Sequence, residues 1–123
     1  MKINPKNIVA NKSYSFALRC IKLFKYLTEE KREFVISKQV LRSGTAIGAL
    51  IREAEHAESK ADFVHKLSIA LKEANETEYW FELLKDSQYI DHNEYISIRP
   101  QIAELNRLLI SIIKTSKEKG RKR

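Results

Sequence analysis

The chain has 123 residues, of which 43% are hydrophobic and 32% charged, proportions that fit one soluble domain with a modest core. Three glycines and two prolines are too few for an all-β fold with many hairpins, and a single cysteine, Cys20, excludes a disulfide framework and a cysteine-based zinc site. The net charge of +7 lies at the two ends of the chain. This charge distribution favours a surface that faces a polyanion, or oppositely charged faces that meet between subunits.

The first predicted helix covers residues 7–27. Its inward side repeats at helical spacing: Val9, Ser13, Phe16, Cys20, Leu23, Phe24 and Leu27. The opposite arc carries four basic residues: Lys12, Arg19, Lys22 and Lys25. Tyr14 and Tyr26 lie near this arc, and a basic face with aromatic neighbours can bind phosphates and stack bases. The four cations are therefore candidate nucleic-acid-binding residues, and the alternative is an ordinary solvated face.

Residues 28–31 break the pattern, and a second helix is predicted over 32–57. Its seam alternates steps of three and four residues, as in helical bundles: Ile36, Val40, Gly44 with Ser43, Ile47, Ile51 and Ala54. Gly44 and Gly48 share one face, and each interior glycine costs roughly 0.5–1 kcal/mol relative to alanine. We expect another helix to approach closely here, with Ile47 and Ile51 as packing neighbours. A ligand at the glycines is the alternative, although no strand precedes them and the G-x-G-x-x-G spacing is absent.

The third helix is predicted over residues 60–88, after a capping-box pattern at Ser59 and Asp62. Its seam is Phe63, Leu67, Ala70, Ala74, Thr77, Phe81 and Leu84. Apolar residues beside this seam widen the face, which predicts a contact outside the subunit. The acids of this helix either form a solvated face or meet a basic face of another subunit, and they are expected to pair with Arg42.

The fourth helix is predicted over residues 91–117, with a capping-type start at Asp91 and with Pro100 either kinking it or marking its first turn. Its seam is Ile98, Ile102, Leu105, Leu109 and Ile112. Residues 118–123 are expected to form a disordered basic tail. The candidate nucleic-acid-binding residues at this end are Lys114, Lys117 and Arg121.

Together these elements predict an all-α fold, an antiparallel up-down-up-down four-helix bundle, as one domain over residues 1–117. The wide apolar faces of the third and fourth helices predict self-association. Because no signal peptide and no run of about 18 apolar residues occurs, we expect a cytoplasmic protein.

Catalytic and metal chemistry find little support in the sequence. Glu53-x-x-His56 and Asp62-x-x-His65 have a spacing that di-iron bundles use, but the first helix offers no acid to complete such a site. No motif marks an activated serine or cysteine nucleophile. We therefore expect no enzymatic activity, no cofactor and no metal, with a metal-dependent enzyme as the weakest alternative.

Two motifs resemble the bacterial four helix bundle protein family, which includes proteins encoded in intervening sequences of large-subunit ribosomal RNA genes and accessory variability determinants of diversity-generating retroelements. The first motif is Gln39-x-x-Arg42-Ser43-Gly44-Thr45-Ala46-Ile47-Gly48-Ala49-x-Ile51-x-Glu53. The second is Asp62-Phe63-x-x-Lys66 with Ile69-Ala70-Leu71-Lys72-Glu73-Ala74-x-Glu76-Thr77-x-Tyr79-Trp80. Ala46 and Leu50 depart from the family, which often has Ser and Asn there.

The resemblance implies a homopentameric barrel without enzymatic activity. In retroelement members it implies a basic surface that binds nucleic acid and a reverse transcriptase. We therefore expect a non-catalytic oligomer that binds RNA or DNA through basic surfaces on the first helix and the tail. In the retroelement branch it would act as an accessory factor to a reverse transcriptase. The alternative is an oligomeric scaffold whose charge asymmetry serves subunit contacts.

Overall fold

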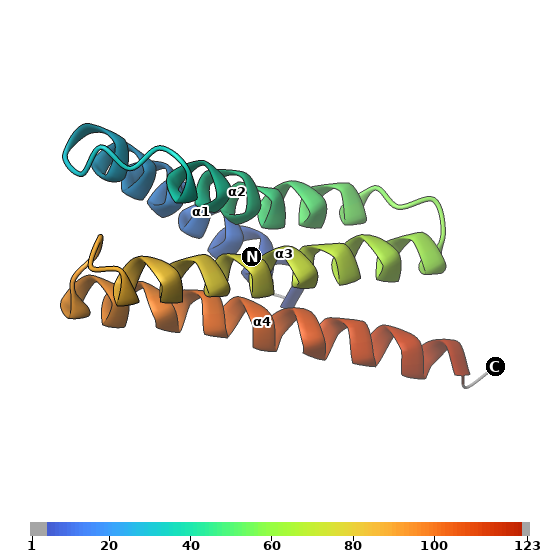
Figure 1. Ribbon diagram of the computed structural model, residues 1–123. Coiled ribbons are helices and arrows are strands. Elements are labelled where there is room, and N and C mark those ends of the chain that lie inside the picture. Colours follow the sequence, from blue (N-terminus) through green and yellow to red (C-terminus); the bar gives the residue numbers. More distant parts are fainter. Residues whose placement is uncertain (1–4, 122–123) are drawn as a thin grey trace.

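The computed structural model describes residues 5–121, and it describes side-chain surroundings for residues 8–119. Within residues 5–121 the chain forms four helices and no strand: α1 (Pro5–Glu29), α2 (Ile36–Glu55), α3 (Lys60–Asp86) and α4 (His92–Arg121). Figure 1 shows the helices side by side, reversing direction at each short connection. This is the four-helix bundle that the sequence predicts.

The predicted inward positions form one apolar core. α2 packs between α1 and α3, α4 packs on α3, and a contact between α1 and α4 closes the bundle. The rings of Phe16 and Phe81 meet edge to face at the centre, with their centroids 6.0 Å apart. Three seam residues are only partly buried: Phe24, Ile36 and Phe63. The helical periodicity of the sequence therefore identified the core almost completely.

Short polar side chains begin α3 and α4 where the sequence predicts them. Ser59 Oγ accepts a hydrogen bond from the Asp62 N–H at 3.0 Å, and Asp62 Oδ2 accepts from the Glu58 N–H at 3.3 Å. Asp91 Oδ1 accepts from the Glu94 N–H at 2.8 Å. The bonds from the Asp62 and Glu94 N–H groups satisfy donors that a helix leaves without partners in its first turn, and the bond from the Glu58 N–H fixes the residue before the Ser59 cap.

The start of α2 differs from the prediction, because the helix begins at Ile36 rather than at residue 32. Arg32 has a positive φ of 56°, and the Glu33 N–H donates to the Leu27 carbonyl oxygen at 2.9 Å. The chain therefore folds back against the end of α1 before the second helix starts.

A buried carboxylate caps α2. Glu33 is 8% exposed, and its two carboxylate oxygens accept backbone hydrogen bonds at 3.2, 3.0 and 2.7 Å from Val35, Ile36 and Ser37. Burial raises the pKa of Glu33, but these hydrogen bonds to the charged form outweigh burial and hold the pKa below its ordinary value of 4.5. The fold therefore keeps this buried carboxylate ionised.

The bounds of α4 decide between two alternatives for Pro100 and correct one expectation about the tail. The helix begins at His92, so Pro100 lies in its interior rather than in its first turn. It continues to Arg121, so residues 118–121 are helical rather than a disordered tail. Residues 122–123 of the predicted tail lie outside the described part of the chain.

Candidate nucleic-acid interface

Two of the four cations predicted to bind nucleic acid from the first helix connect α1 to α4. Lys12 Nζ lies 3.1 Å from Glu104 Oε1. Arg19 donates to the Ser97 carbonyl oxygen at 3.1 Å and to its hydroxyl at 2.6 Å, and it lies 3.4 Å from Glu94 Oε1. A phosphate would have to compete with these bonds, which makes the two residues weaker candidates than their neighbours.

Lys22 and Lys25 are exposed, and neither forms an ion pair with any side chain that the structure describes. They share the solvent face of α1 with exposed apolar groups. Tyr14 is 59% exposed, Leu18 52% and Tyr26 42%. This face could accept phosphates and bases, or it could accept a protein surface.

A groove of about 820 Å³ runs beside Lys22, between α1 and the start of α4. Its lining is Leu18, Arg19, Lys22, Leu23, Tyr26, Ile90, Asp91, Asn93 and Glu94. The carboxylates of Asp91 and Glu94 would repel a phosphate here, so the basic character of this face is partly cancelled.

The cations at the other end of the bundle come from α4 and, unexpectedly, from α3. Lys114 and Lys117 are exposed and make no ion pair within the described part, whereas the side chain of Arg121 lies outside it. Lys117 lines a groove of about 500 Å³ that also includes Lys60 and His65. Neither residue was predicted to bind nucleic acid, and His65 was considered only as a metal ligand, because their place beside Lys117 depends on α3 starting where α4 ends. The antiparallel helix order was the one signal that could have revealed them.

The glycines of the first motif lie against α1. A methyl group on Gly44 would overlap Cys20 Sγ and lie 3.1 Å from Cys20 Cβ, and one on Gly48 would lie 3.2 Å from Ser13 Oγ. The packing residues named beside them are buried: Ile47 and Ile51. The close neighbour at the glycines is therefore helix α1.

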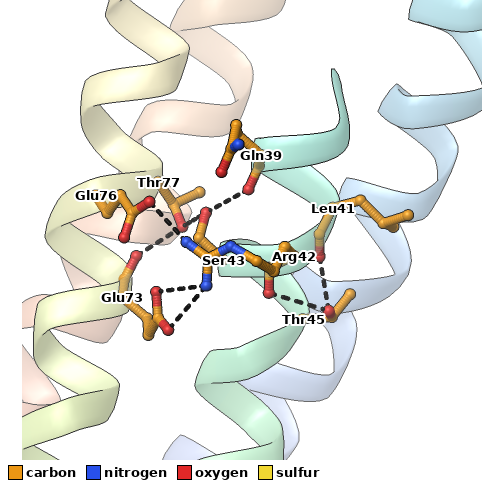
Figure 2. A network of polar contacts seen from close by, with 8 residues as sticks. All are labelled: Gln39, Leu41, Arg42, Ser43, Thr45, Glu73, Glu76 and Thr77. Carbon is orange, nitrogen blue, oxygen red and sulfur yellow. Dashed lines mark hydrogen bonds and ion pairs between the residues drawn. The ribbon is translucent and has the colours of Figure 1, made fainter. Parts of the chain in front are cut away.

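Arg42 joins α2 to α3, as Figure 2 shows. It donates from Nη1 to both carboxylate oxygens of Glu73, at 3.4 and 3.2 Å, and from Nη2 to Glu76 at 2.6 Å. These hydrogen bonds raise the pKa of Arg42, the bond to Glu76 most of all. The expected pairing of Arg42 with the acids of the third helix is present.

A buried pair of hydroxyls forms a second polar contact between α2 and α3 (Figure 2). Thr77 Oγ1 lies 2.7 Å from Ser43 Oγ and 2.7 Å from the Glu73 carbonyl oxygen. Ser43 in turn donates to the Gln39 carbonyl oxygen at 2.9 Å. The polar groups of this motif form their hydrogen bonds within α2 and α3. The motif therefore positions the two helices, and a ligand site is to be sought on the outer surfaces.

The groups weighed for metal binding and catalysis, the carboxylate–histidine pairs and Cys20, lie within the described residues. Within residues 5–121, no three His, Cys, Asp or Glu side chains gather in a way that could hold a metal ion. Glu53, from one of the two carboxylate–histidine spacings, lies 3.3 Å from Lys66 Nζ. Burial raises the pKa of Cys20 to about 12, against a smaller lowering effect of Arg19, so its thiol is a poor nucleophile. None of the described helices is both long enough and apolar enough to cross a bilayer.

Comparison with known proteins agrees with the motifs. The sequence model of the 23S rRNA-intervening sequence protein family matches residues 5–111. The chain belongs to this family. A crystal structure at 1.70 Å resolution of a protein with unknown function, from the S23 ribosomal protein family of Bacteroides thetaiotaomicron VPI-5482, shares 59% identity and a TM-score of 0.89. The match covers 90% of this chain and 99% of that one. No protein of curated function matches the chain.

Membership of the 23S rRNA-intervening sequence protein family confirms the resemblance inferred from the two motifs. One departure from the family pattern has a simple structural counterpart. Leu50, where the family often has Asn, packs against the apolar core. A leucine fits this position because it adds to the core surface.

Proposed function

We propose that this member of the 23S rRNA-intervening sequence protein family is a non-catalytic, oligomeric bundle that binds RNA or DNA through basic surfaces in the cytoplasm, without a cofactor. One observation carries the proposal. Lys22 and Lys25 on α1, and Lys114 and Lys117 on α4, are exposed and have no acidic partner among the described side chains. Such lysines can neutralise phosphates without breaking a bond in the fold, and the net charge of +7 attracts polyanions from a distance.

Binding is tested by fluorescence anisotropy with a labelled RNA hairpin and the matching DNA over a series of KCl concentrations. We expect affinity to fall steeply with salt, because each neutralised phosphate releases counterions. A variant that changes the four unpaired lysines to Gln should weaken binding and flatten the salt dependence. Its control changes four paired cations and removes the same charge: Lys12, Lys66, Lys85 and Arg99. Absence of binding by the wild-type chain at low salt would reject the proposal.

An oligomeric scaffold is the second candidate, and the exposed apolar side chains of α1 favour it. Tyr14, Leu18 and Ile21, which are 59%, 52% and 37% exposed, lie at helical spacing on its solvent face. The apolar residues that widen the α3 face are mostly half-buried against the core, so α1 carries more of this exposed surface than the sequence suggested. Oppositely charged helices would strengthen such a contact between subunits.

The homopentamer that the family resemblance implies is part of this proposal, and native mass spectrometry measures it directly. We expect Leu18→Asp to reduce the oligomer to smaller species, because it places a charge in an apolar contact. Ile110→Asp is the matched control, since Ile110 is equally exposed at 52% but lies on α4. A monomeric wild-type chain would reject the oligomer.

The narrower role of accessory factor to a reverse transcriptase follows only from the resemblance. It requires a reverse transcriptase that co-purifies with the tagged bundle after nuclease treatment. A reverse transcriptase gene beside this one would favour that role, whereas a surrounding ribosomal RNA gene would favour the intervening-sequence branch.

A further inference from the structure

We infer that the groove between the first turns of α3 and the last turns of α4 binds the phosphate backbone of a nucleic acid. The inference rests on the proposed function and names the site at which it occurs. Figure 1 shows that α3 starts and α4 ends at the same end of the bundle. The groove, of about 500 Å³, is lined by Lys60, Ala61, Val64, His65, Ser68, Ser116 and Lys117.

The charge in the groove lining is positive. Lys60 and Lys117 come from two different helices, are both exposed, and form no ion pair within the described part of the chain. No Asp or Glu lines this groove. Three other grooves on the described surface each contain at least one acid, drawn from Glu53, Glu55, Asp91 and Glu94. The acids partly cancel the cations of those three grooves, whereas no acid in the lining opposes Lys60 and Lys117 here.

The groove lining also supplies hydrogen-bond donors. The ammonium groups of Lys60 and Lys117 can each donate to a phosphate oxygen, and so can the ring of His65. The Ser116 hydroxyl makes no hydrogen bond to any side chain or backbone group in the described part, which leaves its proton free. The Ser68 hydroxyl already donates to the Val64 carbonyl oxygen at 2.8 Å. Four donors thus surround one opening.

Further lysines lie near the groove on α4. Lys114 and Lys119 are exposed on the same turns of α4, and the sequence continues with Arg121, Lys122 and Arg123. The acids nearest in sequence lie outside the groove lining: Glu58, Asp62 and Glu118. One of them, Asp62, already accepts the Glu58 N–H at 3.3 Å. Further exposed lysines therefore flank the groove, an arrangement that suits a polyanion better than a single phosphate.

The lining also predicts what is recognised. No Phe, Tyr or Trp side chain lines the groove, so the imidazole of His65 is the one ring in its lining on which a base could stack. Contacts limited to phosphates position a nucleic acid without reading its sequence. Binding at this site is therefore expected to depend on salt and to be nearly independent of base composition.

The test compares two double variants of the full chain that remove equal charge: Lys60→Gln with Lys117→Gln, and Lys38→Gln with Lys72→Gln, two exposed lysines that line none of these four grooves. The probes are labelled single-stranded oligouridylate and oligoadenylate of one length, with affinity measured by anisotropy across KCl concentrations. Each phosphate contact to a single strand contributes about 0.7 to the slope of log K against log salt, so two contacts contribute about 1.4. At 0.1 M salt this corresponds to about 25-fold in affinity.

We expect the Lys60 and Lys117 variant to weaken binding about 25-fold at 0.1 M KCl and to lower the slope by about 1.4, with the Lys38 and Lys72 variant within about threefold of wild type. Thermal melts confirm that both variants fold, since all four side chains are exposed. Equal losses in the two variants, or a larger loss in the Lys38 and Lys72 variant, would overturn this site and leave the proposed function standing. A tenfold preference for one homopolymer would overturn the phosphate-only contact. No binding by wild type would reject both the site and the function.

Discussion

Replacing Gly44 by Ala tests whether the close approach of α1 and α2 organises the bundle. The new methyl group would overlap Cys20 Sγ, and Cys20 is fully buried beside Phe16, which lies 3.8 Å from the same methyl position. Overpacking a core costs about 1–3 kcal/mol, and the better helix propensity of alanine returns about 0.5–1 kcal/mol. We therefore expect a net loss of about 1 kcal/mol, from a range of about 0 to 2.5 kcal/mol, and a loss of about 1 kcal/mol lowers Tm by roughly 5 °C.

Gly48→Ala is the matched control on the same helix. Its methyl group would lie 3.2 Å from Ser13 Oγ and 3.6 Å from the Ser13 carbonyl oxygen, a contact that a small shift can accommodate. We expect its unfolding free energy to stay within about 0.5 kcal/mol of wild type, since the gain in propensity offsets the tight contact.

Cys20→Ala completes the design, because it removes the sulfur atom that the Gly44→Ala methyl group meets. In a double-mutant cycle followed by urea unfolding, the two changes together should cost at least about 1 kcal/mol less than the sum of the single changes. Additive effects, or a Gly44→Ala protein that melts at or above the wild-type temperature, would refute the reasoning.

Three further predictions follow from buried polar groups. Glu33→Gln should lower the unfolding free energy by about 1–3 kcal/mol near neutral pH. Because folding lowers the pKa of Glu33 from 4.5, this loss is complete above that pH and shrinks as the pH falls through the folded-state value, which urea titrations at several pH values measure. Thr77→Val should lower the unfolding free energy by about 1 kcal/mol in urea titrations. Ser43→Ala added to this variant should lower the unfolding free energy by less than it does in the wild-type chain, because the hydrogen bond between the two hydroxyls can be lost only once. With its pKa raised to about 12, the Cys20 thiol should react with a thiol reagent at mild alkaline pH only after guanidinium unfolds the chain; fast labelling of the folded protein would contradict its burial.

The core and the helix number were predictable because apolar spacing maps directly onto a buried helix face. Leu105 and Leu109 need no knowledge of their neighbours to be placed inward. The start of α2 was not predictable in this way. Glu33 looks like one more charged residue in a polar connection, and its role appears only when the chain folds back and its carboxylate reaches the first N–H groups of the helix.

The extent of α4 was misjudged for a related reason. A run of Lys and Glu resembles a disordered tail by its charge, yet both residues have high helix propensity and extend a helix that a core already holds. Charge alone therefore does not mark the end of a helix that packing has nucleated.

The candidate interface was the least predictable feature, because the availability of a cation depends on what the neighbouring helix places opposite it. On α1 the sequence shows only cations, but α4 brings Glu94 and Glu104 against Arg19 and Lys12. At the other end, the antiparallel order brings Lys60 beside Lys117 with no acid in the groove between them. The helix order thus pairs part of the positive charge of α1 with acids of α4. It leaves the strongest unopposed cluster at the junction of α3 and α4, where a phosphate backbone could bind at little cost to the fold.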